Sequence, residues 1–153
     1  MAIQSITPFL WFDTQAEEAA NFYAALFPDA HILEVSRYGR NMPGPEGSVM
    51  VVAMEIAGQR VSLMNGGPHF KLDMAFSFLV NCEDQAEIDR LWTALGDGGK
   101  PSQCGWVTDR FGLTWQINYA GLPGLMRRNG QKVMEAMMTM TRIDIQALKA
   151  AAG

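Results

Sequence analysis

The 153-residue chain is 48% hydrophobic and 18% charged, which is the composition of a single globular domain. Its formal net charge of −4 and its scattered Lys and Arg residues exclude the clustered basic face that nucleic-acid binding needs. There is no apolar run long enough to cross a bilayer, and residues 1–4 lack the basic start of a signal peptide. We therefore expect a cytoplasmic protein that binds neither nucleic acid nor membrane.

The first part of the chain predicts a strand, a helix and three further strands. Ile6–Phe12 is a short apolar run typical of a strand. Thr14, followed three residues later by Glu17, predicts a capping box at the start of a helix. Apolar residues then recur at helical spacing until Pro28 ends the segment. The remaining strands are predicted at His31–Tyr38, Ser48–Ile56 and Arg60–Met64.

The next part repeats this order after the loop that begins at Asn65-Gly66-Gly67-Pro68. A strand is predicted at Ala75–Asn81, and Asp84 is positioned to cap a second helix. The glycine-rich residues 96–99 end that helix. Two later strands, Cys104–Thr108 and Leu113–Asn118, flank a turn and form a second hairpin.

The tail departs from the repeated pattern. Gln131–Met140 is predicted to be a helix with a broad, methionine-rich apolar face. Asp144 is positioned to cap a last helix that runs through Leu148. Methionine-rich faces adapt to irregular partners. The tail therefore either packs on its own sheet, or forms a subunit contact or a lid over a ligand site.

Identical residues recur at an offset of 69, for example Phe9 and Phe78, and Leu10 and Leu79. A repeat of this length is too long for a solenoid unit. It predicts an α+β fold in which two tandem βαβββ modules form a curved mixed sheet around a central cleft. We expect a single domain, 1–153, with module one at about 4–65, module two at about 74–119 and a helical tail at about 121–153.

Five segments together resemble the PhnB-like branch of the vicinal oxygen chelate superfamily, which includes glyoxalase I, extradiol dioxygenases and bleomycin and fosfomycin resistance proteins. These segments are Ile6–Asp13, Asn65–Phe70, Cys104–Trp106, Asp109–Gln116 and Val133–Met137. The resemblance implies paired βαβββ modules, a homodimer and a ligand cleft formed by the curved sheet. Members of this branch are often labelled 3-demethylubiquinone-9 3-methyltransferases.

The same resemblance implies where a metal would bind. Metal-dependent members carry ligands on the first and last strands of each module, which correspond here to about Thr7 and Phe76, and to about Ser62 and Gln116. None of the four is His, Asp, Glu or Cys, the usual ligands of a metal that polarises a substrate. The two cysteines, Cys82 and Cys104, form no CxxC motif and are expected to be buried thiols. We therefore expect no metal and no other cofactor.

Catalytic residues are not identified by the sequence. His31 is expected at the surface, whereas His69 lies in the Gly-Pro loop and is either an ordinary loop residue or an acid–base group facing the cleft. A methyltransferase usually holds its methyl donor at a glycine-rich turn between a first strand and a helix. The corresponding turn here, Asp13-Thr14-Gln15, has no glycine.

Alternation along the strands predicts a cleft with aromatic walls and a few polar groups, which suits a small apolar or aromatic ligand. Thr7, Phe9 and Trp11 would face it from the first strand, and Phe76, Phe78 and Val80 from its counterpart. The alternative, which is favoured for Phe9 and Phe78, is that these aromatic side chains fill the core. The predicted binding residues are Thr7, Trp11, Ser62, Asn65, His69, Phe76, Trp106 and Gln116.

Three functions agree with these residues. The first is a metal-free small-molecule-binding protein of the resistance-protein type. The second is a glyoxalase-type or dioxygenase-type enzyme with a relocated metal. The third is a methyltransferase or an accessory factor in quinone chemistry, as the family label suggests. The sequence does not distinguish a catalyst from a binding protein.

Overall fold

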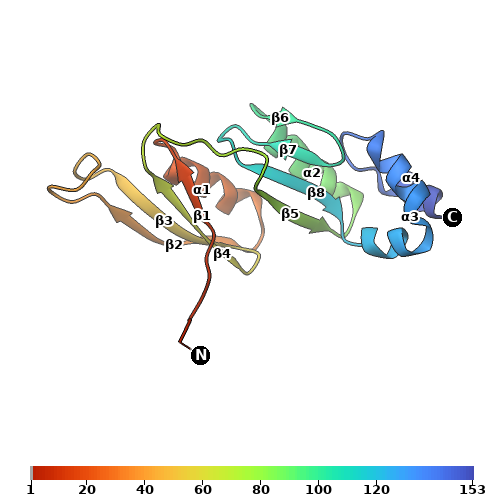
Figure 1. Cartoon of the computed structure of the whole chain (residues 1–153), viewed down its shortest axis with the longest axis horizontal. Coiled ribbons are helices and arrows are strands. Elements are labelled where there is room, and N and C mark those ends of the chain that lie inside the picture. Colours follow the sequence, from red (N-terminus) through yellow and green to blue (C-terminus); the bar gives the residue numbers. More distant parts are fainter. Residues whose placement is uncertain (1) are drawn as a thin grey trace. The chain divides into compact units, whose positions relative to one another are not determined.

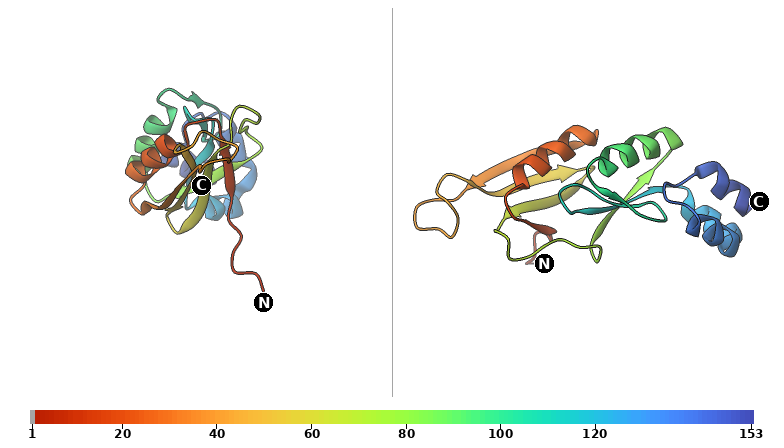
Figure 2. Two further views of the ribbon diagram at one scale, coloured as in Figure 1. Left: turned by 90° about the vertical axis from the view of Figure 1, so that its left-hand side faces the viewer. Right: turned by 90° about the horizontal axis from the view of Figure 1, so that it is seen from above.

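The computed structural model describes residues 2–153 and contains two compact units, the first ending at Leu72 and the second spanning Asp73–Gly153. Each unit contains a four-stranded mixed sheet, and one helix lies along one face of that sheet (Figures 1 and 2). In residues 2–153 no helix has the length and apolar character needed to cross a membrane.

The first unit has the order β-α-β-β-β. Its sheet has the strand order β1-β4-β3-β2, in which β1 is parallel to β4 and the other neighbours are antiparallel. The buried residues of the strands lie on the face covered by the helix, where Val52, Met54 and Leu63 are fully buried. The elements are β1 (Phe9–Phe12), α1 (Ala16–Leu26), β2 (Ala30–Arg37), β3 (Val49–Ile56) and β4 (Gln59–Asn65).

The second unit repeats this order and adds two helices. Its sheet has the strand order β5-β8-β7-β6, again with one parallel pair, β5 with β8. The elements are β5 (Ser77–Cys82), α2 (Gln85–Gly96), β6 (Lys100–Pro101), β7 (Trp106–Thr108), β8 (Thr114–Tyr119), α3 (Leu122–Met138) and α4 (Ile145–Ala152). The tandem βαβββ arrangement with C-terminal helices is therefore confirmed, with the hydrogen bonds forming two four-stranded sheets.

The helices keep the predicted offset of 69, because α1 begins at Ala16 and α2 at Gln85. The first strands do not. Phe9 pairs with Ser62, and the residue that pairs with Gln116 is Leu79, which is 70 positions after Phe9. Ser62 and Gln116 are matched because each lies four residues after the glycine of its hairpin turn.

This one-residue shift moves side chains between faces of the sheet, because strand side chains alternate. Leu10 is 4% exposed, whereas Leu79, its identical partner at offset 69, is 53% exposed. Phe9 is 57% exposed, whereas Phe78 packs on the buried Trp115 with ring centroids 5.3 Å apart. The prediction that Phe76, Phe78 and Val80 correspond to Thr7, Phe9 and Trp11 was therefore wrong; their counterparts are Ser77, Leu79 and Asn81.

The two helices are capped differently. Asp84 caps α2 as predicted, since its carboxylate accepts a hydrogen bond from the Glu87 amide at 2.9 Å. The predicted capping box at Thr14 and Glu17 was wrong, because Gln15 precedes α1 and no side chain at that position caps it. Instead the side-chain oxygen of Asn65, at the end of β4, accepts a hydrogen bond from Ala16 N at 2.8 Å.

The first helix of the tail is longer than the predicted Gln131–Met140. It starts at Leu122 and is interrupted at Asn129, whose backbone is not helical and whose side chain accepts a hydrogen bond from Lys132 N. Asp144 caps α4 as predicted, through the Ala147 amide at 3.1 Å. The Gln85 side chain, at the start of α2, donates to Ile143 O and accepts from Ile145 N, which joins the start of α4 to α2.

Candidate ligand site

A cavity of about 520 Å³ lies at one end of the first sheet. It is lined by the β1–α1 turn and the first turn of α1, by the loop between β2 and β3, and by the segment that follows β4. Both β1 and β4 point their carboxyl ends toward it, because they are parallel. This position, outside the carboxyl ends of parallel strands and beside a helix start, is a common place for ligands in sheets of α/β proteins, and the volume falls in the usual range for small-molecule sites.

Asn65 fixes three walls of this cavity. Its side-chain oxygen accepts the hydrogen bond from Ala16 N at the start of α1, and its side-chain nitrogen donates to Val49 O on β3 at 3.2 Å. Its backbone carbonyl accepts a hydrogen bond from the Tyr38 hydroxyl at 2.6 Å. The Asn65 amide groups are therefore occupied by the protein itself, and Asn65 holds the site together rather than offering a free amide to a ligand.

Trp11 holds the loop that closes the same region. Its indole nitrogen donates to Gly67 O at 2.9 Å, and Phe70 packs edge-on against its ring at 5.1 Å. A Cβ at Gly66 would lie 2.2 Å from the Trp11 ring, so only glycine fits between this ring and the loop. The Gly66-Gly67 pair thus allows the backbone to pass directly over the indole.

The loop between β2 and β3 approaches Tyr38 in a similar way. A Cβ at Gly44 would lie 2.3 Å from a carbon of the Tyr38 ring, so this loop can cross the ring only with a glycine at that position. Pro43 and Pro45 on either side of Gly44 also line the cavity. Tyr38 therefore contacts two walls of the cavity. Its ring packs against the loop between β2 and β3, and its hydroxyl bonds to Asn65 at the end of β4.

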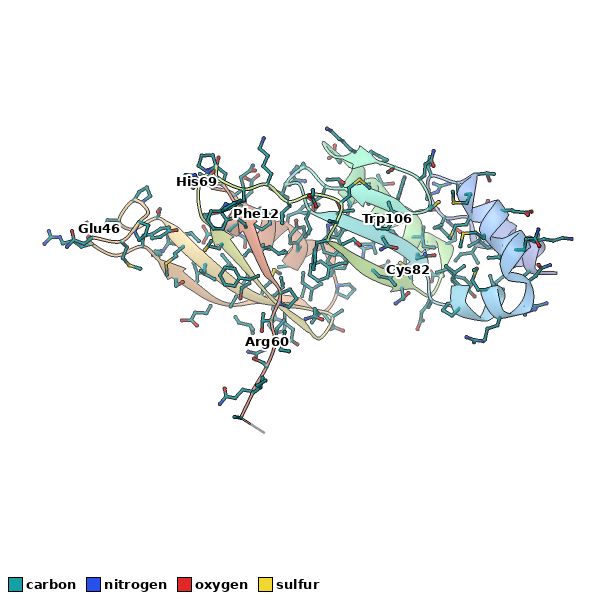
Figure 3. The ribbon with its side chains drawn as sticks, in the orientation of Figure 1. Phe12, Glu46, Arg60, His69, Cys82 and Trp106 are labelled. Carbon is teal, nitrogen blue, oxygen red and sulfur yellow. The ribbon has the colours of Figure 1, made fainter. Side chains whose placement is uncertain are left out.

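Ionisable side chains around the cavity are mainly acidic. Asp13, Glu17 and Glu18 line it, together with His69 from the loop after β4 (Figure 3). Arg37 pairs with one of these carboxylates: its guanidinium lies 3.8 Å from Glu17, with both side chains about half exposed. Exposed pairs at this distance are weak, so the region remains acidic.

The predicted binding residues fall into two sets, one in each unit. In the first unit, Asn65 and His69 line the cavity, and Trp11 holds its closing loop. Ser62 pairs with Phe9, so it lies on the face of the sheet opposite α1. Thr7 precedes β1 and is half-buried.

In the second unit, Trp106 and Gln116 are directly opposite each other on β7 and β8 (Figure 3 labels Trp106). The Gln116 amide nitrogen donates to the Ser77 hydroxyl at 2.9 Å. Phe76 lies just before β5 and packs edge-on against Phe78, with ring centroids 5.1 Å apart. The structure thus places Phe76 beside Phe78, whereas the neighbours of Gln116 are Trp106 and Ser77.

The sequence did not predict the contributions of Tyr38, Asp13 and Glu17 to a site. The signal was present only in part, in the Pro-Gly-Pro loop and the Gly-Gly pair, which mark close approaches of the backbone. What they approach, the Tyr38 and Trp11 rings, is a tertiary contact that local sequence does not encode.

The residues do not fit a metal of the type that the resemblance implied. After the register correction the four positions are Thr7, Ser62, Ser77 and Gln116, which offer no carboxylate, imidazole or thiolate. Across residues 2–153, no three His, Cys, Asp or Glu side chains are grouped in a way that would hold a metal ion.

The two cysteines differ in their surroundings. Cys82 is buried as predicted, and its burial, together with the nearby Glu87 and Asp84 carboxylates, raises the pKa of its thiol to about 11. Cys104 was also expected to be buried but is only half-buried, because it lies in the turn before β7 with its sulfur 3.7 Å from that of Met138. Neither lies at the cavity.

Residues 4–118 match the model of the family described as 3-demethylubiquinone-9 3-methyltransferase. The chain belongs to this family. A search of the curated proteins found no match. The family description names a reaction, and the matched region contains all of the first unit's sheet and cavity as well as β5 to most of β8.

Solved structures share the fold of this chain. The chain is 36% identical to the PhnB protein of Bacillus cereus, with a TM-score of 0.66, over 74% of this chain and 97% of that one. A protein from Pseudomonas aeruginosa has a TM-score of 0.61 at 22% identity, covering 74% of this chain and 95% of that one. The fosfomycin resistance protein FosX from Mesorhizobium loti has the same fold at 16% identity and a TM-score of 0.53, covering 79% of this chain and 94% of that one.

Proposed function

We propose that the chain is a small-molecule-binding protein of the vicinal oxygen chelate fold, and that its ligand occupies the cavity at the end of the first sheet. The observation that carries this proposal is the cavity itself, whose walls are fixed by hydrogen bonds from Asn65, Tyr38 and Trp11. A site whose walls are already in place loses little conformational entropy when a ligand enters, which favours binding.

The experiment is a screen of small aromatic and amphipathic compounds by amide NMR. We expect compounds that bind to shift the resonances of Asn65, Gly66, Gly67 and His69. Ser48→Trp, which places a large side chain on the cavity wall, should abolish these shifts. Thr93→Trp, on the exposed side of α2, is the matched control and should leave them unchanged. Binding that survives Ser48→Trp would contradict the proposal.

Trp106 and Gln116 in the second unit do not line this cavity, and we propose that they form a separate polar and aromatic contact for an apolar or aromatic ligand. A tryptophan offers a large stacking face, and the Gln116 amide offers an acceptor as well as the nitrogen already bonded to Ser77. We therefore still propose that Gln116 orients a ligand, although its side chain also bonds to Ser77 on the neighbouring strand.

Gln116→Leu and Ser77→Ala separate these two roles. Both variants remove the 2.9 Å hydrogen bond between the side chains, so each should lower the free energy of unfolding by about 1 kcal/mol. Only Gln116→Leu should also weaken a compound whose binding shifts the resonances of Trp106 and Gln116, by about 1–3 kcal/mol, if the amide pairs with a buried ligand group. Equal affinities for the two variants would make Gln116 a purely structural residue.

The finer expectations from the sequence are part of the same proposal: a cytoplasmic homodimer without a resident metal or other cofactor. The absence of suitable ligands at Thr7, Ser62, Ser77 and Gln116 supports the metal-free state. Elemental analysis that finds about one Zn, Ni, Mn or Fe per purified chain would contradict it and favour the enzyme alternative.

The family description favours methyl transfer as a second candidate function. Its methyl donor would need a site, and the turn between β1 and α1 contains no glycine to admit a charged cofactor at the helix start. Calorimetry with S-adenosylmethionine tests this candidate directly: saturable binding that Ser48→Trp removes would favour methyl transfer over simple binding.

A further inference from the structure

We propose that the cavity at the end of the first sheet takes an organic cation, an amine or quaternary ammonium group on a small apolar body. This inference rests on the proposed function, that the cavity is a ligand site, and it assigns the charge and chemical class of the ligand. It is carried by the cavity's volume and by the sign of the charges that line it.

The charge around the cavity is negative. Three carboxylates, from Asp13, Glu17 and Glu18, line it, and none of its lining residues is a Lys or Arg. Arg37 is the ion-pair partner of Glu17, but at 3.8 Å and with both side chains about half exposed it offsets little of this charge. A cleft lined by one sign of charge concentrates ligands of the opposite sign.

The start of α1 does not reverse this preference. A helix N-terminus carries about half a positive charge and attracts anions when its amides are free. Here Ala16 N is already bonded to the Asn65 side chain, and Glu17 and Glu18 add two formal negative charges within the first turn. An anionic ligand would therefore meet net repulsion at this helix start.

The arrangement of the carboxylates favours an organic cation over a metal ion. A metal needs several ligands that converge on one point. In the described part of the chain, residues 2–153, these carboxylates and His69 form no such group. Carboxylates that line one side of a cavity of about 520 Å³ instead match a cation whose charge is carried by a larger molecule.

The remaining walls supply contacts for the apolar body of such a ligand. Tyr38, Val49, Pro43 and Pro45 line the side formed by β3 and the loop before it. An aromatic ring close to carboxylates is a common environment for ammonium groups, because the ring face also attracts a cation. The cavity thus combines an acidic side with an aromatic and apolar side.

Three probes with the same aromatic body test the inference: benzylamine, benzyl alcohol and benzoate. Binding is measured on the full chain by NMR titration at low and high salt. We expect benzylamine to bind tightest, to shift resonances at Asn65–His69, and to weaken as salt rises because exposed charges are screened. Benzoate should bind weakest.

Charge-neutral variants provide the matched controls. Glu17→Gln and Glu18→Gln should each weaken benzylamine binding about 2- to 5-fold while leaving benzyl alcohol unchanged. Glu34→Gln, an exposed carboxylate on β2 outside the cavity, changes the net charge equally and should have no effect. Because Glu18 and Glu34 are exposed and Glu17 is about half exposed, the fold should tolerate all three changes.

The outcomes separate the two proposals. If benzyl alcohol or benzoate binds at these residues as tightly as benzylamine, the cavity is a ligand site but the assignment of a cation is wrong. The same conclusion follows if Glu34→Gln weakens benzylamine as much as Glu17→Gln does. If no probe shifts the cavity resonances, both the cation assignment and the proposed site are wrong.

Discussion

Asp109→Ala is expected to lower the free energy of unfolding by about 3–5 kcal/mol, measured by urea denaturation. Asp109 is 4% exposed, and one of its oxygens accepts hydrogen bonds from the amides of Phe111 and Leu113, at 2.9 and 3.1 Å. Its other oxygen accepts a hydrogen bond from the Trp115 indole at 2.9 Å. Alanine would remove the acceptor of these three N–H groups inside a buried turn.

A double-mutant cycle with Trp115→Phe isolates the indole bond. Phenylalanine removes the indole donor, so adding Asp109→Ala to Trp115→Phe should cost about 1–3 kcal/mol less than Asp109→Ala alone. Asp109→Asn keeps one acceptor for the two amides and should lie between wild type and alanine. A loss below about 1 kcal/mol for Asp109→Ala would show that this network does not stabilise the turn.

The Asp109 network also explains part of the sequence pattern. The segment from Asp109 to Gln116 contributed to the family resemblance, yet its acidic residue and its tryptophan bond to each other in the core of the second unit. This part of the motif specifies a hairpin turn. Gln116, one residue after Trp115, points to the other face of the strand.

Local sequence patterns predicted most helices and strands, but they did not predict contacts between residues that are far apart in the sequence. Asp84 caps α2 because its partner amide, Glu87 N, lies only three residues away. Nothing near Ala16 in the sequence identifies Asn65, 49 residues later, as the group that bonds to its amide. The Thr14 and Glu17 pattern was locally reasonable, but the Asn65 side chain occupies the place of the cap.

The strand register shows the same limit. Two identical residues, Phe and Leu, recur at the offset that fits the helices, so the sequence predicted one offset for the whole module. The sheet instead matches Phe9 with Leu79, because hydrogen bonding to β4 and β8 sets the register of the first strand in each unit. The error exchanged inward and outward faces and placed Phe76 in the candidate site in place of Ser77.

Asn65→Leu is expected to lower the free energy of unfolding by about 2–3 kcal/mol, because it removes both side-chain bonds of Asn65 while keeping its approximate size. Ala16 is fully buried, so its amide cannot turn to water for a replacement partner. The cavity walls formed by α1 and β3 should also separate, which would weaken any ligand bound there. Urea denaturation and NMR titration measure the two effects.

Two further variants show whether Asn65 acts as the cap. Asn65→Asp keeps the oxygen that accepts from Ala16 N, but its second oxygen faces the Val49 carbonyl, so it should cost about 1–2 kcal/mol, less than Asn65→Leu. Thr14→Ala removes the residue that the sequence pattern predicted as the cap, yet it should change stability by less than about 0.5 kcal/mol, because no side chain there caps the helix. If Thr14→Ala proved as harmful as Asn65→Leu, the start of α1 would depend on the local sequence, and the link that Asn65 makes between helix, sheet and cavity would be incidental to the fold.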